Sequence, residues 1–287
     1  MMDSSLCDIQ CDLCGKSEFE LFSVSNATFH NRRYKCLTCG LVASWPQATK
    51  EQLENYYSIY YPQIYKKILN PNLIKKRLEQ DKKHLQRMFP EPGKLMDVGC
   101  ASGDYLEMAK EIGWDVQGIE LSKKLADKAR ERVGANRIFI GDIKKGHFPN
   151  ETFDLVRIWH VIEHVPSPKE LMLETYRILK KNGKILIGTP NIDEPDYQIK
   201  RAVRHFKGKP AGMATSQEHT FEFSEKTLSV LIEKCGFKVL RKERYYLFDD
   251  QYKPTNWKDL ILMTSFYSIS KVMPGRMGNL IRLVAVK

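Results

Sequence analysis

The stretch Leu95-Met-Asp-Val-Gly-Cys-Ala-Ser-Gly-Asp104 decides the fold of this chain. It has the pattern of a buried strand that runs into a tight glycine turn and then into a helix. Glu120 follows at the end of the next apolar run, Val116–Glu120. A doubly wound α/β sheet uses a strand, a glycine turn and a later acidic residue to hold a nucleoside-bearing cofactor.

The spacing of this turn indicates which cofactor it suits. A dinucleotide turn has the pattern Gly-x-Gly-x-x-Gly, so that a pyrophosphate rests on the helix N-terminus. Here the pattern is Asp97-x-Gly99-x-Ala101-x-Gly103, and the carboxylate at the strand end would repel a phosphate. The turn therefore favours a cofactor with a cationic or zwitterionic tail.

In these motifs the chain resembles the class I S-adenosylmethionine (AdoMet)-dependent methyltransferases. Three later segments continue the resemblance in the family's order: Gly141-Asp-Ile143, Phe153–Val165 and Leu179–Ile187. Together the motifs cover residues 90–245. The resemblance implies an α/β fold with a doubly wound, mostly parallel seven-stranded sheet, as in Rossmann-like methyltransferases, and AdoMet as cofactor. Within the family the chain is most similar to bacterial sugar and small-molecule methyltransferases of the methyltransferase-23 or UbiG-like type.

The turn and the acidic residues have distinct expected roles. The backbone from Gly99 to Gly103 must approach the cofactor closely, which a bulky side chain would prevent. Asp97 suits the amino group of the methionine moiety, and Glu120 suits the two ribose hydroxyls. The resemblance implies that Leu121 and Ile143 pack on the adenine and that Asp142 accepts a hydrogen bond from the adenine amino group. The expected cofactor-binding residues are Asp97, Gly99, Cys100, Ala101, Gly103, Glu120, Leu121, Asp142 and Ile143.

Four of the seven cysteines form two knuckles, Cys11-Asp-Leu-Cys14-Gly and Cys36-Leu-Thr-Cys39-Gly. A Cys-x-x-Cys turn places two thiolates at a metal's width, and the following glycine allows the tight knuckle. We therefore predict a zinc ribbon over residues 1–45, with a structural Zn²⁺ held by Cys11, Cys14, Cys36 and Cys39. Two disulfides or four free thiols are the alternatives, and Cys7 is a competing ligand; disulfides are disfavoured in the cytosol.

The rest of the chain divides into a linker and a catalytic domain. We expect residues 46–90 to form a helical linker, with a helix over Pro71–Phe89, that covers the cofactor pocket. Residues 91–287 alternate between strand and helix patterns, interrupted by a substrate insertion at 191–223. Residues 250–279 are interpreted as an amphipathic cover packed on the domain, or alternatively resting on a membrane surface. The predicted strands are Leu95–Val98, Val116–Glu120, Arg137–Ile140, Leu155–Trp159, Lys184–Gly188, Phe237–Arg241 and Leu280–Val286. The predicted helices are Asp104–Ile112, Lys123–Val133, Pro168–Leu179 and Glu225–Cys235.

Methyl transfer depends mainly on alignment of the acceptor, and a base is needed only if the acceptor must lose a proton. His160 ends the fourth predicted strand, which faces the methyl group in the family. Glu163-His164 is interpreted as opening the next helix, where the carboxylate would favour the helix N-terminus.

The segment Glu218-His219-Thr-Phe-Glu-Phe223 resembles the Glu-His pair of zinc-ribbon sugar C-methyltransferases, whose His acts in proton abstraction. Ser216 stands where those enzymes have a Tyr, and their large C-terminal domain is absent from this sequence, which weakens the case for C-methylation. His219, His160 and Glu218 are the candidate catalytic residues. In the alternative interpretation His219 is a loop histidine bonded to a backbone carbonyl.

The composition is that of an ordinary globular chain: 287 residues, 42% apolar and 28% charged. No apolar run reaches the ~18–20 residues that span a bilayer, and the N-terminus has no signal-peptide pattern, so we expect a cytoplasmic protein. The net charge is +11, spread over helical segments without interleaved aromatics. That distribution disfavours nucleic acid. It is interpreted as a solvated basic surface or, alternatively, as suited to a phosphorylated or lipid-linked acidic acceptor.

We therefore predict an AdoMet-dependent methyltransferase that acts on a small molecule, with a sugar or nucleotide-sugar as acceptor and O- or C-methylation both open. One alternative is a quinone- or lipid-type O-methyltransferase. Another is a zinc-ribbon RNA methyltransferase, but Trp159-His-Val-Ile replaces the Asn/Asp-Pro-Pro-Tyr turn of amino-methylating enzymes. A non-catalytic binding module is disfavoured because the cofactor motif is intact.

Overall fold

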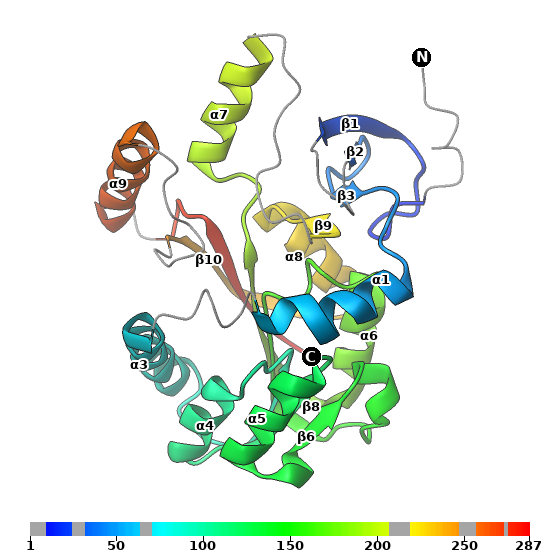
Figure 1. Cartoon of the computed structure of the whole chain (residues 1–287), viewed down its shortest axis with the longest axis vertical. Helices are drawn as coiled ribbons and strands as arrows, with labels where there is room; N and C mark the ends of the chain where they lie inside the picture. Colours follow the sequence, from blue (N-terminus) through cyan, green and yellow to red (C-terminus); the bar gives the residue numbers. More distant parts are fainter. Residues whose placement is uncertain (1–9, 25–31, 64–70, 207–218, 247–256, 273–274) are drawn as a thin grey trace.

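The protein contains two β-sheets of different size (Figure 1). The structure, a computed structural model, describes residues 10–24, 32–63, 71–206, 219–246, 257–272 and 275–287. The larger sheet has seven strands in the order β10-β11-β8-β7-β4-β5-β6. Every strand runs parallel to its neighbours except β11, which is antiparallel to both β8 and β10. Its strands are β4 (Lys94–Val98), β5 (Asp115–Glu120), β6 (Ile138–Ile140), β7 (Phe153–Trp159), β8 (Leu179–Pro190), β10 (Lys238–Tyr245) and β11 (Leu280–Val286).

Strand β4 is the point at which the strand order reverses. The chain proceeds from β4 through β5 to β6 on one side, and through β7 to β8 on the other. In open α/β sheets a ligand binds in the crevice outside the carboxyl ends of the strands at such a switch point. The residues that follow β4, β5 and β7 are therefore the ones placed to form a site.

Helices cover both faces of this sheet because its strands are apolar on both sides. On one face α3, α4 and α5 pack on alternate strand residues such as Leu95 and Leu155. On the other face α6 and α8 pack on their neighbours Met96 and Val156. The helices are α1 (Lys50–Asn55), α3 (Pro71–Met88), α4 (Asp104–Glu111), α5 (Lys123–Val133), α6 (Pro168–Ile178), α7 (Pro195–Phe206), α8 (Glu225–Lys234) and α9 (Trp257–Val272), with a π-helical turn η2 (Tyr56–Tyr60) after α1 and 3-10 turns η3 (Ala135–Arg137) and η4 (Ile143–Gly146).

The smaller sheet joins the predicted ribbon to the predicted insertion. Its order is β1-β2-β3-β9, with β1 (Phe19–Val24), β2 (Arg32–Cys36), β3 (Val42–Ser44) and β9 (Phe221–Glu222). Val42 and Ala43 pair antiparallel with Glu222 and Phe221. Cys36 and other ribbon residues also belong to the main core cluster. The N-terminal segment is thus tied to the edge of the sheet where the candidate site lies.

The predicted α/β fold is confirmed. Most helix and strand bounds lie within about two residues of the predicted ones, but β8 begins at Leu179 rather than Lys184, and β10 continues to Tyr245 rather than ending at Arg241. One interpretation is wrong: Glu163 and His164 do not open a helix, because α6 begins at Pro168 with Ser167 as its N-cap. Helix α7 lies within the predicted insertion at 191–223, where no helix was predicted.

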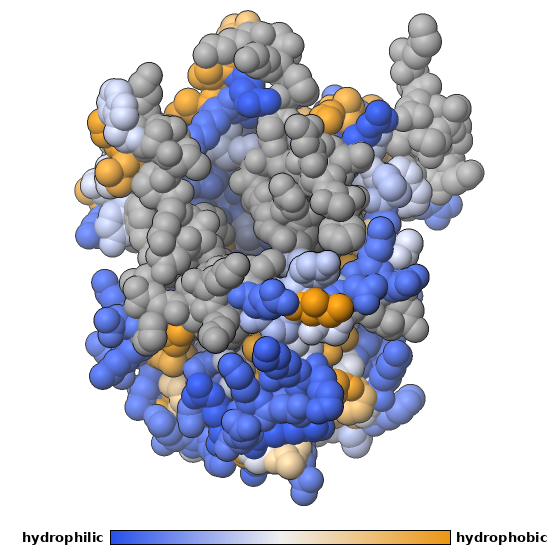
Figure 2. All heavy atoms as spheres, in the orientation of Figure 1, coloured by the Kyte–Doolittle hydropathy of each residue, from blue (hydrophilic) through white to orange (hydrophobic). Residues whose placement is uncertain are grey.

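Apolar side chains gather on the outer surfaces of α7 and α9, which contact each other (Figure 2). Exposed large apolar side chains on these helices include Val203, Phe206, Trp257, Ile261 and Val272. The lower half of the same view, over α4 and α5, is mainly hydrophilic. Among the described residues, no helix is both long and apolar enough to cross a membrane.

Candidate active site

The glycine turn after β4 has a backbone that only small residues tolerate. The amides of Gly99 and Cys100 both donate to the Ile119 carbonyl, at 2.8 and 2.9 Å, so the turn folds against the end of β5. Gly99 has φ +74°, and a Cβ there would lie 2.4 Å from Cγ2 of Val161. Gly103 has φ +80°, and a Cβ there would lie 2.9 Å from the Ala129 Cα. Positive φ and the close packing of Val161 and Ala129 therefore both require glycine at these two positions.

Glu120 is fastened to this turn. It ends β5, is almost fully buried, and accepts hydrogen bonds from the Ala101 and Ser122 amides at 2.9 and 2.8 Å. Burial raises the pKa of its carboxyl group above the ordinary value. Each carboxylate oxygen retains a second lone pair for a ligand hydroxyl. Leu121, next in the chain, is exposed. The predicted ribose and adenine contacts thus lie beside the turn.

Asp97 has a partner that sequence reasoning missed. Arg157 of β7 lies directly opposite Asp97 in the parallel register, and its Nη1 lies 2.9 and 3.1 Å from the two carboxylate oxygens. Both residues are buried, and the guanidinium stacks 3.8 Å from the Tyr105 ring centroid. The available sequence signal was a single basic residue, Arg157, within an apolar strand, which needs an acidic partner such as Asp97 when it is buried. If Asp97 also binds the amino group of the cofactor, as predicted, its carboxylate must interact with that group and with Arg157 at the same time.

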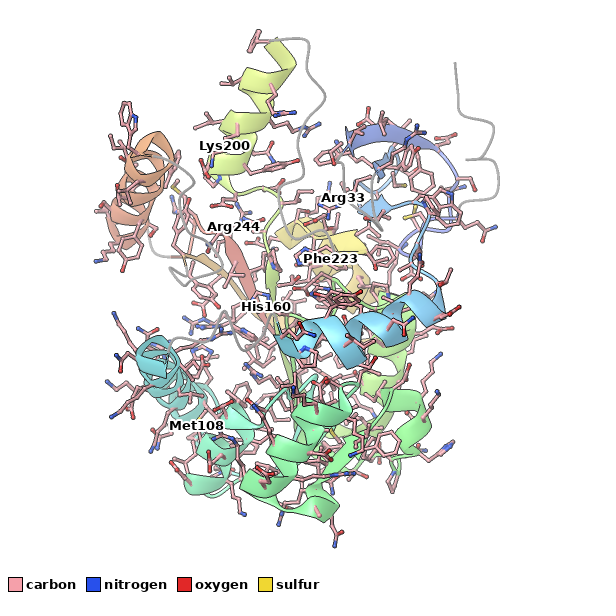
Figure 3. All side chains as sticks on the ribbon, viewed as in Figure 1. Arg33, Met108, His160, Lys200, Phe223 and Arg244 are labelled. Atoms are coloured by element: carbon pink, nitrogen blue, oxygen red, sulfur yellow. The ribbon has the colours of Figure 1, made fainter. Side chains whose placement is uncertain are left out.

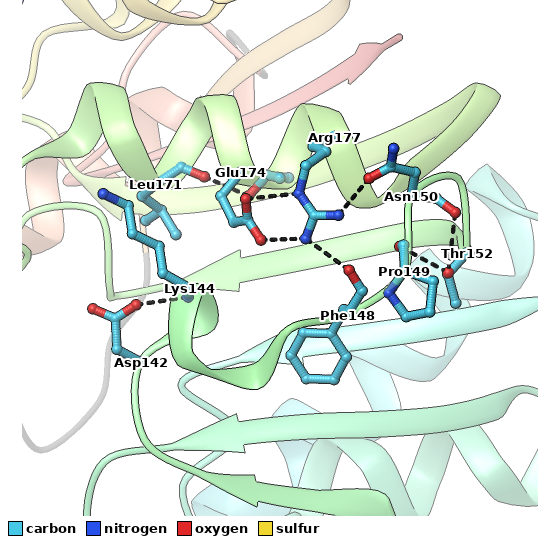
Figure 4. Close-up of polar contacts among 10 residues, drawn as sticks. Asp142, Lys144, Phe148, Pro149, Asn150, Thr152, Leu171, Glu174 and Arg177 are labelled. Atoms are coloured by element: carbon cyan, nitrogen blue, oxygen red, sulfur yellow. Dashed lines mark hydrogen bonds and ion pairs between the residues drawn. The ribbon is translucent and has the colours of Figure 1, made fainter.

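Asp142 and Ile143 follow β6 in a braced turn (Figure 4). Asp142 is exposed and accepts from the Lys144 amide at 2.7 Å, while Ile143 is buried in the main core. Arg177 of α6 holds the far end of this loop by donating to the Phe148 carbonyl at 2.7 Å. The adenine contact of Asp142 stays a prediction. Ile143, which was predicted to pack on the adenine, is buried in the main core.

His160 follows β7 and reaches a buried acid. Its Nδ1 lies 3.2 Å from Oε1 of Glu163, and Oε2 of Glu163 accepts from the Thr189 hydroxyl at 3.0 Å. Burial alone would raise the pKa of Glu163, but the His160 hydrogen bond and the nearby imidazoles of His164 and His219 lower it to about 2. Glu163 is therefore an anion. His160, labelled at the centre of Figure 3, is the more exposed member of the pair.

His219 joins this group from the segment that precedes β9. Its ring packs edge-to-face on His164, with 4.8 Å between ring centroids, and it is 5% exposed. The amides of Thr220 and Phe221 both donate to the Glu163 carbonyl, which fixes the two segments together. The structure thus brings His219 and His160, two of the three predicted catalytic residues, around Glu163. Glu218 lies outside the described residues.

The four knuckle cysteines come together at the base of the ribbon. Sγ of Cys11 lies 3.5 Å from that of Cys39, and Sγ of Cys14 lies 3.5 Å from that of Cys36. Tetrahedral Zn–S bonds of about 2.3 Å place sulfurs ~3.8 Å apart. Burial raises the pKa of the Cys39 thiol to about 11, a cost that coordination of a cation would remove. The donor set fits a structural zinc ion, which stays a proposal.

Comparison with known proteins gives the family. The model of a methyltransferase-domain family matches residues 73–242, more than half of the chain. The chain belongs to this family, and the resemblance to class I AdoMet-dependent methyltransferases is confirmed.

Named relatives match only part of the chain. Phosphoethanolamine N-methyltransferase 3 of Arabidopsis thaliana is 32% identical over 133 residues, which are 42% of this chain and 27% of that protein. A ubiquinone biosynthesis O-methyltransferase of Glaesserella parasuis is 29% identical over 115 residues, 37% of this chain and 49% of that protein. The matched part thus spans less than half of each of these relatives.

Solved structures share the fold. An AdoMet-dependent methyltransferase from Archaeoglobus fulgidus superposes with a TM-score of 0.54 at 19% identity, covering 79% of this chain and all of that one. Magnesium protoporphyrin IX methyltransferase from Synechocystis, solved with S-adenosylhomocysteine (AdoHcy), gives 0.55 at 13% identity, with coverage of 83% and 100%. At these identities the likeness establishes the architecture alone.

Proposed function

We propose that this protein transfers the methyl group of AdoMet to a hydroxyl oxygen of a small acceptor of sugar or nucleotide-sugar type. The observation that carries the proposal is the junction of Glu120 with the Gly99–Gly103 turn at the switch point of the sheet. A ribose-binding carboxylate and a close backbone approach occur there together. His160 directly follows the neighbouring strand β7 at the same edge.

The residues fit AdoMet as follows. The turn is assigned to the methionine moiety because it follows β4 at the switch point of the sheet, and its positive-φ glycines keep the backbone tight there. Glu120 receives the ribose hydroxyls and Leu121 flanks the base. Bound AdoMet supplies an activated methyl group on a sulfonium. The protein's part is then to align the acceptor and exclude water.

Proton removal from the acceptor falls to His160. Glu163 is anionic, buried and bonded to Nδ1 of His160, an arrangement that orients an imidazole and stabilises it once protonated. His219 is more deeply enclosed, between His164 and Glu222. We therefore assign His160 as the base and His219 as a residue that shapes the site, which favours O-methylation over C-methylation.

A lipid- or quinone-linked acceptor is the second candidate. The large apolar side chains exposed on α7 and α9, two helices that contact each other, support it because they suit an apolar partner. The two relatives named for O- and N-methylation of small molecules are compatible with either acceptor class.

Isothermal titration with AdoMet and AdoHcy tests the cofactor. We expect micromolar binding of both, and Glu120→Ala should weaken it by about tenfold or more through loss of charge-assisted hydrogen bonds. Glu131→Ala, on the exposed face of α5, is the matched control. Transfer of a labelled methyl group from AdoMet is then measured with nucleotide-sugars and with quinols as acceptors, and the two classes are compared. Equal affinity of the Glu120 variant and the native protein would remove the cofactor assignment.

A further inference from the structure

Glu163, His164 and His219 place three potential metal ligands in one small volume. One ligand atom from each residue lies within 4.8 Å of the other two. Glu163 and His219 are buried and His164 is half-buried. Two imidazoles and one carboxylate are a common ligand set for first-row divalent cations with open positions. In the described part of the chain the four ribbon cysteines form the other such group.

The separations are close to those of a coordination shell. A cation bonded at about 2.1 Å holds neighbouring ligands ~3 Å apart and opposite ligands ~4 Å apart. The ligand atoms of Glu163, His164 and His219 lie within 4.8 Å of one another. Side-chain shifts of less than about 1 Å would therefore bring all three into bonding distance of one ion. The backbone is fixed already, because the Thr220 and Phe221 amides hold the His219 segment to the Glu163 carbonyl.

The groups behind the three ligands also match a metal site. Nδ1 of His219 makes no hydrogen bond among the described residues, but it lies 3.5 Å from Oε1 of Glu222, whose partner is Arg33. Nε2 is then the nitrogen that would face an ion. Metal-bound histidines usually donate their second N–H to a carboxylate, and bound carboxylates are themselves hydrogen-bonded. Thr189 and His160 do this for Glu163.

We propose that Glu163, His164 and His219 bind a divalent transition-metal ion whose open positions receive oxygen atoms of the acceptor. This inference rests on the proposed function and narrows it to hydroxyl acceptors that chelate, such as vicinal diols. The ion lowers the hydroxyl pKa. The acceptor O–H proton passes to His160, the oxygen bonds the methyl carbon, and the S–CH₃ bond breaks to leave a neutral thioether.

Cobalt titration of the full chain, with zinc first loaded into the ribbon, measures the site directly. Isothermal titration should find ~1 further equivalent, in the micromolar range or tighter, and the bound Co²⁺ should lack thiolate charge-transfer absorption because its ligands are nitrogen and oxygen. His219→Gln and His164→Gln should each weaken this binding by about tenfold or more. His147→Gln, on an exposed turn, should leave it unchanged.

AdoMet affinity and the thermal midpoint, measured on each variant, separate loss of the ion from loss of the fold. If His219→Gln unfolds, the half-buried His164→Gln decides the matter. If no Co²⁺ binds beyond the ribbon zinc, or if the bound Co²⁺ persists in both histidine variants, the inference is overturned. If the metal inference fails but AdoMet binding and methyl transfer are normal, the proposed function still holds. If AdoMet does not bind but Co²⁺ does, the proposed function fails and the metal site remains.

Discussion

Arg33 of β2 and Glu222 of β9 form an ion pair with side chains only 2% and 1% exposed. The pair links the ribbon to the strand that follows His219, and Nε of Arg33 also lies 3.4 Å from the Ser44 hydroxyl. That hydroxyl in turn donates to the His219 carbonyl at 2.9 Å. Figure 3 labels Arg33 above His160. The ribbon thus takes part in holding the candidate site.

Arg33→Ala leaves the Glu222 carboxylate buried without its cation. We expect a loss of about 3–5 kcal/mol in the free energy of unfolding, measured by urea denaturation. Arg33→Met combined with Glu222→Leu should recover most of that loss, because an apolar pair of similar volume is often tolerated in place of a buried ion pair. Arg32→Ala, exposed on the same strand, is the control. A loss under about 1 kcal/mol for Arg33→Ala would mean that the pair is solvated in solution.

Loss of zinc from the ribbon should loosen the segment that carries His219, because ribbon strand β3 pairs with β9, which follows that segment. Cys39→Ala should remove ~1 equivalent of zinc per chain, since a tetrahedral site needs all four thiolates. Cys235→Ala, a buried cysteine on no knuckle, should remove none. Hydrogen exchange in residues 219–223 should accelerate in the Cys39 variant while the Gly99–Gly103 turn stays protected. Unchanged hydrogen exchange in residues 219–223 would show that the ribbon zinc does not stabilise the candidate site.

Ala101 stands in the cofactor turn with φ +48°, a left-handed conformation that favours glycine. Ala101→Gly should therefore stabilise the fold by up to about 1 kcal/mol, with AdoMet affinity within about threefold of the native value. Gly103→Ala makes the opposite test, because its Cβ would meet the Ala129 backbone. It should cost about 2 kcal/mol or more. Destabilisation by Ala101→Gly would show that the alanine methyl packs usefully.

Local sequence patterns were sufficient for the main sheet and its cofactor turn. The predicted helix Lys123–Val133 and strand Leu280–Val286 match the observed bounds, because periodicity and terminal signals are both strong there. Long-range polar pairs carry no such signal. Arg157 reaches Asp97 only through strand register, and Arg33 reaches Glu222 only after the ribbon docks. Glu163 was misplaced although Ser167 and Glu170 mark the true helix start.

His84 of α3 gives the fold a pH dependence with a defined direction. The ring is buried with Nδ1 3.3 Å from Nη1 of Arg282, and burial and that guanidinium lower the pKa of His84 to about 4. Arg87 and Arg241 act in the same direction, and Glu243 opposes them. The unfolded chain, with a His pKa near ~6.5, binds the proton more tightly. Stability therefore falls as the pH drops from about 6.5 towards 4, by up to about 3 kcal/mol from this group.

His84→Gln removes this titration. Its free energy of unfolding should fall less steeply than that of the native protein between pH 6.5 and pH 4.5, and urea denaturation at several pH values measures both slopes. His147→Gln, which alters an exposed histidine, should keep the native slope. Parallel curves for the native protein and His84→Gln would mean that the imidazole is already solvated in the folded state and that Arg282 does not oppose its protonation.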